Sequence, residues 1–113
     1  MPTQRFGQVV RLKPDAFDEY KRLHDSIWPE LVDAMRAANL HNSTIFHHAN
    51  MLFMYYEYWG EDLEADLARV SESPQSREWA QLTNALQMSL DGRTTDDPDD
   101  DLWTPLAEIF HID

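Results

Sequence analysis

"HNSTIFHHANMLFMYYEYWG" (residues 41–60) predicts two antiparallel strands joined by a tight turn. Both halves are rich in β-branched and aromatic residues, which favour strands. Only Ala49 and Asn50 separate the halves, and asparagine tolerates the left-handed backbone conformation that short hairpin turns require. Gly60 marks the end of the second strand. We therefore expect a β-hairpin in the middle of the chain.

A strand and an interrupted helix are predicted before this hairpin. The segment "RFGQVVRL" (Arg5–Leu12) is apolar at most positions, a pattern typical of a strand. Pro14 then suits the first position of a helix. Pro29 cannot sit inside that helix, because it would remove a hydrogen bond and push the preceding residue towards an extended conformation. We therefore predict a break near Asp25–Trp28 and a second helix from Pro29.

The second half of the chain predicts two more helical segments and a final strand. Apolar residues at helical spacing indicate a helix over about 63–70. Ser73–Pro74 suits the N-cap and first position of another helix, which we expect to continue to about Leu90. The run "DGRTTDDPDDD" (91–101) holds six aspartates in eleven residues, and their repulsion predicts an exposed acidic surface loop. The segment "LWTPLAEIFHI" (102–112) returns to a strand pattern.

The order of these elements, β-α-β-β-α-β, predicts a ferredoxin-like α+β fold, in which a four-stranded antiparallel sheet carries helices on one face. We assign residues 1–113 to a single domain. The strand at 51–59 is aromatic on both faces, and only one face can lie under the helices. The other would leave a large apolar surface exposed on a monomer. We therefore expect a homodimer in which two sheets pack face to face and enclose a cavity, a dimeric α+β barrel.

Composition excludes several classes of partner. The net charge of −12 argues against nucleic acid and against an anionic membrane surface, because both attract basic proteins. With no cysteine, the chain has no disulfide, no thiolate nucleophile and no cysteine zinc site. The first residues lack the apolar region of a secretory signal, and no run approaches the ~20 apolar residues that span a bilayer. We therefore expect a cytoplasmic protein.

Tyr20 and His24 are the first candidates for chemistry. They stand four residues apart, so one helix face carries both side chains. On spacing alone, such a tyrosine and histidine more often form a half-buried structural pair that packs over the edge of a sheet. Function is the alternative: imidazole titrates near neutral pH, which makes it a natural proton donor or acceptor. The predicted helix end just beyond His24 would leave its ring accessible.

Glu57 and Glu108 are further candidates, because each is a single charge in an otherwise apolar strand. Such a carboxylate faces solvent, forms an ion pair or shifts its pKa. The two could therefore be structural, or could serve as a general base or as acceptors for sugar-like hydroxyl groups. Trp79 is more often a core residue, but a tryptophan beside an acid and an arginine also suits stacking on a sugar. Metal binding is not expected, because His47 and His48 are adjacent in a strand and point to opposite faces.

Four segments together resemble the L-rhamnose mutarotase family. They are "RLKPDAFDEYKRLHDSIWPEL", "HNSTIF", "MLFMYYEYW" and "LAEIFHID", in this order and spacing over nearly the whole chain. The resemblance implies a small dimeric ferredoxin-like protein that needs no cofactor and interconverts the α and β anomers of 6-deoxy-L-hexoses. It also implies that His24 is the catalytic proton donor and that Tyr20 is a substrate ligand. Some relatives in this family act on L-fucose.

Two positions depart from the family pattern and concern the choice of sugar. Ser43 follows the "HN" pair, where the family's rhamnose enzymes carry a substrate-binding tyrosine. Glu78 replaces the first residue of a tryptophan doublet, and Trp79 keeps the second. L-rhamnose and L-fucose differ in the orientation of the C2 and C4 hydroxyl groups. Polar groups in place of aromatic rings would alter hydroxyl recognition, so the preferred sugar stays open between these two.

Mutarotation suits the residues at hand, because it needs one acid and one base but neither metal nor nucleotide. We expect His24 to protonate the ring oxygen, Tyr20 to position the sugar or relay a proton, and Glu57 or Glu108 to act as base or hydroxyl anchor. Two alternatives remain from sequence. One is a cofactor-independent monooxygenase-like or haem-degrading enzyme on the same architecture. The other is a non-catalytic module that binds a partner or small ligand.

Overall fold

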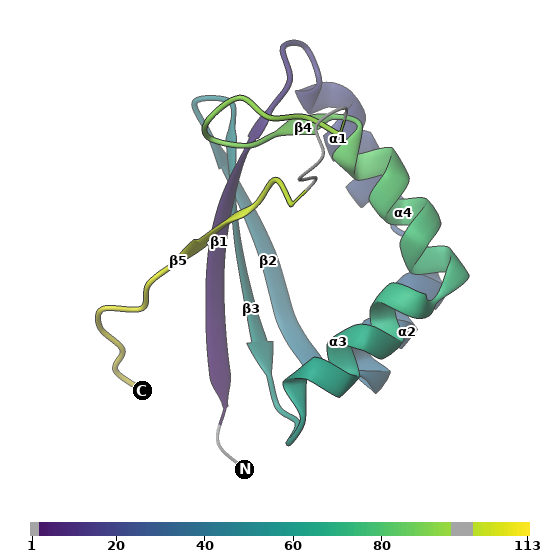
Figure 1. The fold of residues 1–113 in the computed structure, drawn as a ribbon, viewed down its shortest axis with the longest axis vertical. Helices are drawn as coiled ribbons and strands as arrows, with labels where there is room; N and C mark the ends of the chain where they lie inside the picture. The colour runs from purple at the N-terminus through teal and green to yellow at the C-terminus, as the bar shows by residue number, and fades with distance from the viewer. Residues whose placement is uncertain (1–2, 96–100) are drawn as a thin grey trace.

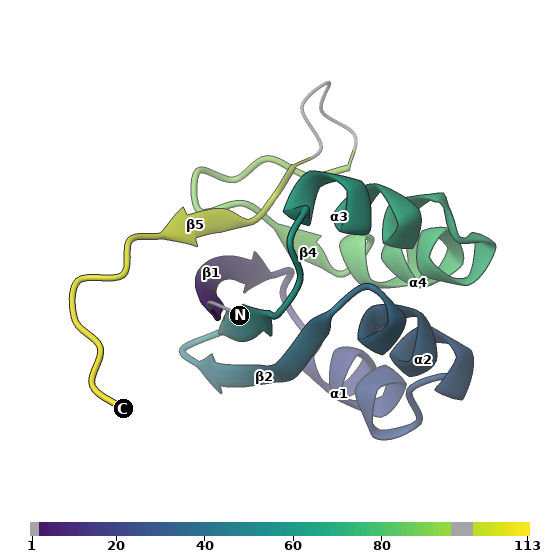
Figure 2. The same ribbon diagram turned by 90° about the horizontal axis from the view of Figure 1, so that it is seen from below.

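The computed structural model describes residues 3–95 and 101–113 and shows an antiparallel sheet with helices on one side (Figures 1 and 2). In chain order the elements are β1 (Gln4–Leu12), α1 (Phe17–Asp25), α2 (Pro29–Ala37), β2 (Leu40–His48), β3 (Met51–Tyr58), α3 (Leu63–Glu72), α4 (Pro74–Asn84), β4 (Gln87–Met88) and β5 (Thr104–Leu106). The strands follow the order β2-β3-β1-β4, and β5 also pairs with β1. The predicted α+β, ferredoxin-like order of elements is confirmed.

The proline break in the first helical region lies where the sequence predicts it. α1 ends at Asp25 and α2 starts at Pro29. Trp28 has an extended backbone with φ −70° and ψ 129°, the conformation favoured before proline. The start of α1 differs from the prediction: it is Phe17 rather than Pro14, because Asp15 has a left-handed backbone (φ 62°) that interrupts a right-handed helix. Among the described residues, no helix combines the length and apolar character needed to cross a membrane.

The predicted hairpin between β2 and β3 is present, with Ala49 and Asn50 both left-handed (φ 52° and 62°). This pair of positive φ angles matches the right-handed twist of the strands that it joins. The turn is also tied to the end of β1. Asn50 Nδ2 donates to the Leu12 carbonyl at 3.0 Å, and the Leu12 amide donates to the Asn50 carbonyl at 2.9 Å. The hairpin and β1 therefore hold each other in register.

The sheet has two distinct sides. The helix-facing side carries Val10 and Leu12 of β1 with Leu52 and Tyr58 of β3, and all four are buried. They meet the helices directly, since Leu52 packs with Tyr20 of α1 in the core. The outer side carries the alternate residues of the same strands, Arg5, Val9, Met51, Phe53, Tyr55 and Glu57. Figure 2 shows the helices on the first side only. The prediction that β3 is aromatic on both faces, with one face under the helices, is confirmed.

A buried polar network joins α3 to the end of β3. The Tyr58 hydroxyl donates to Asp66 of α3 and accepts from the Asp62 amide at 2.9 Å. Asn39 Nδ2 donates to the same Asp66 carboxylate at 3.1 Å. Gly60 passes so close that a Cβ atom there would collide with the Tyr58 hydroxyl. Buried polar groups are tolerated when they are hydrogen-bonded, and this network fixes one end of the helix layer to the sheet.

The C-terminal part of the chain differs from the prediction. α4 ends at Asn84 rather than near Leu90, because a tight turn, with the Leu86 amide on the Thr83 carbonyl at 3.0 Å, follows it. Gln87–Met88 then pair with the end of β1 as β4. The strand predicted over 102–112 is limited to Thr104–Leu106, and the apolar residues beyond it are exposed: Ile109 by 95%, Phe110 and Ile112 each by 77%. The fourth strand is thus divided into two short pieces along β1.

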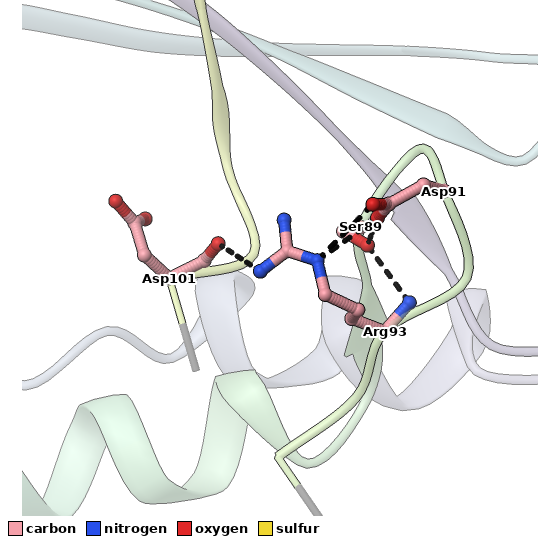
Figure 3. A network of polar contacts seen from close by, with 4 residues as sticks. All are labelled: Ser89, Asp91, Arg93 and Asp101. Atoms are coloured by element: carbon pink, nitrogen blue, oxygen red, sulfur yellow. Dashed lines mark hydrogen bonds and ion pairs between the residues drawn. The ribbon is translucent and has the colours of Figure 1, made fainter. Parts of the chain in front are cut away.

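The predicted acidic loop at 91–101 falls partly outside the described residues, which omit 96–100. Its two described ends are joined by polar contacts (Figure 3). The Arg93 amide donates to the Ser89 hydroxyl at 2.8 Å, and Arg93 Nε donates to the Asp91 carboxylate at 3.0 Å. Arg93 Nη1 reaches the Asp101 carbonyl at 3.4 Å. Hydrogen bonds from Ser89 and Arg93 lower the pKa of Asp91, so this carboxylate stays charged.

We predict that Ala49→Gly stabilises the protein, because glycine adopts φ 52° without the steric cost that alanine bears. The gain in the free energy of unfolding should be about 0.5–1 kcal/mol, measured by urea titration. The matched control is Ala68→Gly, at an exposed position inside α3, which should destabilise the protein by about 1 kcal/mol. If both changes shift stability in the same direction, the strain assigned to Ala49 is wrong.

Candidate active site

Tyr20 and His24 lie one turn apart on α1 with their rings stacked. The ring centroids are 4.4 Å apart and the planes differ by 26°. Tyr20 is only 5% exposed and belongs to the core, whereas His24 is half-buried. The side chains are therefore neighbours on one helix face, as their spacing predicts. Packing fixes the phenol, and the imidazole beside it keeps contact with solvent.

The backbone of α1 selects the tautomer of His24. His24 Nδ1 lies 2.9 Å from the Tyr20 carbonyl oxygen. A carbonyl can only accept a hydrogen bond, so Nδ1 carries the hydrogen that it donates. In the neutral ring, Nε2 then carries the lone pair. The local fold thus holds the ring through one nitrogen, and the other nitrogen is the one that a ligand could contact.

Two tryptophans extend this aromatic group across the helix layer. The Trp79 ring of α4 meets the His24 ring edge to face at 5.0 Å, and Trp28 meets Trp79 in the same way at 5.3 Å. All three side chains are half-buried. The structure therefore brings Trp79 to His24, as a shared site requires. Trp28 was missed by the sequence reasoning, which interpreted it only as the residue before the helix break.

Gln87 was also missed, and it contacts the candidate pair directly. Its Nε2 donates to the Tyr20 hydroxyl at 3.3 Å, and the residue is 1% exposed. Burial raises the pKa of Tyr20 to about 12, while the hydrogen bond from Gln87 acts in the opposite direction. The phenol is therefore neutral over the physiological range. The predicted continuation of the last helix to Leu90 concealed Gln87, because it placed this residue on a helix instead of the sheet edge.

The sheet beneath these residues is not sealed by the helices. On its helix-facing side, the buried residues Leu52 and Tyr58 lie at the two ends of β3, whereas Met54 and Tyr56 between them are half-buried. Phe6 of β1, stacked on Tyr56 at 5.1 Å, is half-buried too. Solvent therefore reaches the middle of this side. Cavities of about 250 and 270 Å³ lie elsewhere, one near Asn50 and Met88 and the other on the outer side.

Glu57 and Glu108 are not brought to His24. Glu57 alternates with the buried Tyr58 and lies on the outer side, where it accepts hydrogen bonds from Tyr55 at 2.7 Å, Trp59 at 2.9 Å and Asn42 at 3.1 Å. These three donors lower its pKa. Glu108 forms an ion pair with Arg5 at 2.6 Å, next to the 270 Å³ cavity on the outer side. Both carboxylates have polar partners, and the sheet separates them from the imidazole.

The remaining candidates lie at the surface. Ser43 is exposed in the irregular step of β2 between His41 and Thr44, and Glu78 is exposed on α4 next to Trp79. Their roles stay predictions. His47 pairs with Leu52 and stacks on Phe17 of α1 at 4.0 Å, so it faces the helices. Within the described residues, no group of three or more His, Asp or Glu side chains has the arrangement of a metal site.

Comparisons with known proteins show which family the sequence matches and which folds are similar. The sequence matches the L-rhamnose mutarotase family over residues 5–112. An L-rhamnose mutarotase of Oceanobacillus iheyensis is 31% identical over 112 residues, which are 97% of this chain and 99% of the relative. A solved L-rhamnose mutarotase from Formosa agariphila superimposes with a TM-score of 0.75 at 23% identity, covering 97% and 99% of the two chains. A solved antibiotic biosynthesis monooxygenase gives a TM-score of 0.56 at 19% identity, covering 96% and 99%. At these identities the two structures show the fold alone.

We predict that Tyr20→Phe reduces the loss of stability at alkaline pH. The folded pKa of about 12 exceeds the value of about 10 in an unfolded chain, so the folded state binds the phenol proton more tightly. The resulting stability is complete below about pH 10 and is lost as the pH rises towards about 12. Urea unfolding from pH 8 to 12 should show that the wild type loses on the order of 2 kcal/mol more than the variant. Equal losses would contradict the burial of this phenol.

Proposed function

The chain belongs to the L-rhamnose mutarotase family, and from this we propose that it interconverts the α and β anomers of L-rhamnose. It is an isomerase that acts on sugar anomers. The observation that carries the proposal is the stacked pair of Tyr20 and His24, set in a chain that matches the family over residues 5–112. The likeness to a monooxygenase structure concerns the fold and does not favour that chemistry.

In the proposed mechanism, His24 transfers a proton between Nε2 and the ring oxygen of the sugar. Ring opening removes the proton from the anomeric hydroxyl, breaks the bond between C1 and the ring oxygen, and places a proton on that oxygen. Rotation about the C1–C2 bond and the reverse transfers then close the other anomer. The hydrogen bond from Nδ1 to the Tyr20 carbonyl supports this role, because it leaves Nε2 as the exchanging atom. Tyr20 positions the sugar through its neutral phenol.

The acceptor of the anomeric proton is not one of the two strand carboxylates in this proposal. Glu57 and Glu108 lie on the outer side of the sheet with polar partners of their own. Solvent reaches the helix-facing side, where Met54 and Tyr56 are half-buried, and a water there takes the proton. The overall transfer is neutral, so the site needs no permanently charged base. This replaces the expectation that a carboxylate acts as base.

The aromatic group suits a 6-deoxy sugar, which carries an apolar methyl group among its hydroxyl groups. Trp79 offers apolar ring surface next to the His24 ring, and Trp28 extends that surface on the other side of Trp79. Glu78, directly before Trp79, could accept a hydrogen bond from a sugar hydroxyl, and Ser43 on β2 offers a hydroxyl group. These polar groups stand where the family's rhamnose enzymes carry aromatic rings. L-fucose is for this reason the second candidate substrate.

We also propose that the protein is a homodimer in which the outer sides of two sheets face each other. The outer side includes Phe46, which is 62% exposed, and is flanked by the exposed Trp59 and Leu106. Beyond β5, the exposed Phe110 lines the outer-side cavity together with Tyr55 and Leu106. Large exposed apolar side chains gathered on one side of a sheet favour an interface. A second copy with the same surface would cover it by two-fold symmetry.

We expect His24→Ala to slow anomer exchange by about 10²–10⁴-fold, because it removes the proposed proton donor. Saturation-transfer NMR on equilibrated L-rhamnose, L-fucose and D-glucose measures the exchange and the preferred sugar together. The matched control is His48→Ala, an exposed histidine of β2 whose neighbour His47 faces the helices. It should leave exchange unchanged. Unaltered exchange in His24→Ala would refute the assignment of the proton donor.

If the protein is a dimer, analytical ultracentrifugation at micromolar concentration should give twice the mass of one chain. Phe46→Glu should shift the protein to monomer, because it would bury one charge from each copy in the proposed interface. Leu67→Glu, at an exposed leucine on α3 in the helix layer, is the control and should stay dimeric. A monomeric wild type in analytical ultracentrifugation would refute the interface.

A further inference from the structure

Gln87 is a buried polar residue that contacts Tyr20 and that the proposed mechanism does not use. It begins β4, where it pairs with Leu12 at the end of β1. Paired residues share a side of the sheet, so Gln87 lies on the helix-facing side with Leu12, which is fully buried. Its carboxamide reaches the Tyr20 hydroxyl, 3.3 Å from Nε2. A residue of the sheet edge thus meets the phenol of α1 inside the core.

Stability alone does not account for a carboxamide at this place. Gln87 Oε1 is buried and has no hydrogen-bond partner among the described residues. An unpaired buried acceptor destabilises a protein, and such groups are rare in native structures. Methionine would fill nearly the same volume opposite Leu12 without an unpaired oxygen, but it could not donate to the Tyr20 hydroxyl. The carboxamide therefore satisfies the buried Tyr20 oxygen but leaves its own oxygen without a partner among the described residues.

The hydrogen bond from the Gln87 side chain determines whether the Tyr20 hydroxyl donates or accepts its next hydrogen bond. Because Nε2 is a donor, the Tyr20 oxygen accepts, and the phenol hydrogen must point away from Gln87. Among residues 3–95 and 101–113, the Tyr20 hydroxyl donates to no acceptor. The ring itself is held by stacking on His24 at 4.4 Å. The phenol is thus fixed in position, with one donated hydrogen bond still to make.

We propose that Gln87 is a positioning residue for Tyr20, which it holds as a hydrogen-bond donor towards the sugar at His24. This inference rests on the proposed mutarotase function. Gln87 does not touch the substrate. Its carboxamide donates a hydrogen bond to the phenol oxygen. The phenol is then expected to donate its own hydrogen to a sugar oxygen rather than to accept a hydrogen bond from the sugar. A preoriented donor avoids the cost of ordering the phenol when the sugar binds.

The test compares Gln87→Met and Gln87→Glu with wild type in the saturation-transfer assay on L-rhamnose. Gln87→Met keeps the volume but removes the donor, and exchange should fall about 3- to 10-fold, the worth of one neutral hydrogen bond. The exposed Gln81→Met on α4 is the matched control and should retain wild-type exchange. Gln87→Glu should be impaired when its carboxylate is ionised, because it then draws the phenol hydrogen to itself. Its activity should recover as the pH falls and the protonated carboxyl donates again.

A double-mutant cycle separates positioning from a general effect on structure. In the Tyr20→Phe background the phenol is absent, so Gln87→Met should cause no further loss of exchange. The inference is overturned if Gln87→Met stays within twofold of wild type, or if it causes the same loss with and without the Tyr20 hydroxyl. If Gln87→Met fails to fold by circular dichroism, the pH profile of Gln87→Glu decides: recovery at low pH supports the inference, and a profile parallel to wild type overturns it. A wild type without exchange on any sugar instead refutes the proposed function.

Discussion

The antiparallel pairing of β1 with β3 is the constraint on which the other features depend. Its register runs from Gln4 opposite Tyr58 to Arg11 opposite Met51 without interruption. Because side chains alternate with a period of two, this register assigns every residue of both strands to one side of the sheet. It places Tyr58 under α3 and the adjacent Glu57 on the outer side. A slip by one residue would bury the carboxylate and expose the phenol.

The site depends on where the helix layer is interrupted. α1 ends at Asp25 and Pro29 starts α2, so His24 lies in the last turn of α1 and Trp28 directly precedes α2. The break therefore allows both aromatic rings to meet Trp79 of α4. The helix that carries the imidazole also supplies the carbonyl that fixes its tautomer. The backbone of one nine-residue helix, Phe17–Asp25, therefore determines which nitrogen of His24 carries the hydrogen.

Much of the fold could be predicted because its signals are local. Ala49–Asn50 indicated the hairpin, Pro29 the helix break, and Ser73–Pro74 the start of α4, and each lies where expected. These residues act through their own backbone preferences, which do not require knowledge of distant partners. The errors came where local preference was overridden. Asp15 delays α1, and pairing with β1 draws Gln87 from the expected helix into β4.

The sequence by itself determined the order of the elements and the Tyr20–His24 pair, because backbone preference and helical spacing are properties of neighbouring residues. Only the tertiary structure decided which other groups join that pair. It brought Trp79 and Gln87 to α1, placed Trp28 against Trp79, and kept Glu57 and Glu108 on the other side of the sheet. These choices follow from strand register and from packing between segments far apart in the chain. A short segment of sequence carries no information about such long-range contacts, because they form only when the helices pack on the sheet.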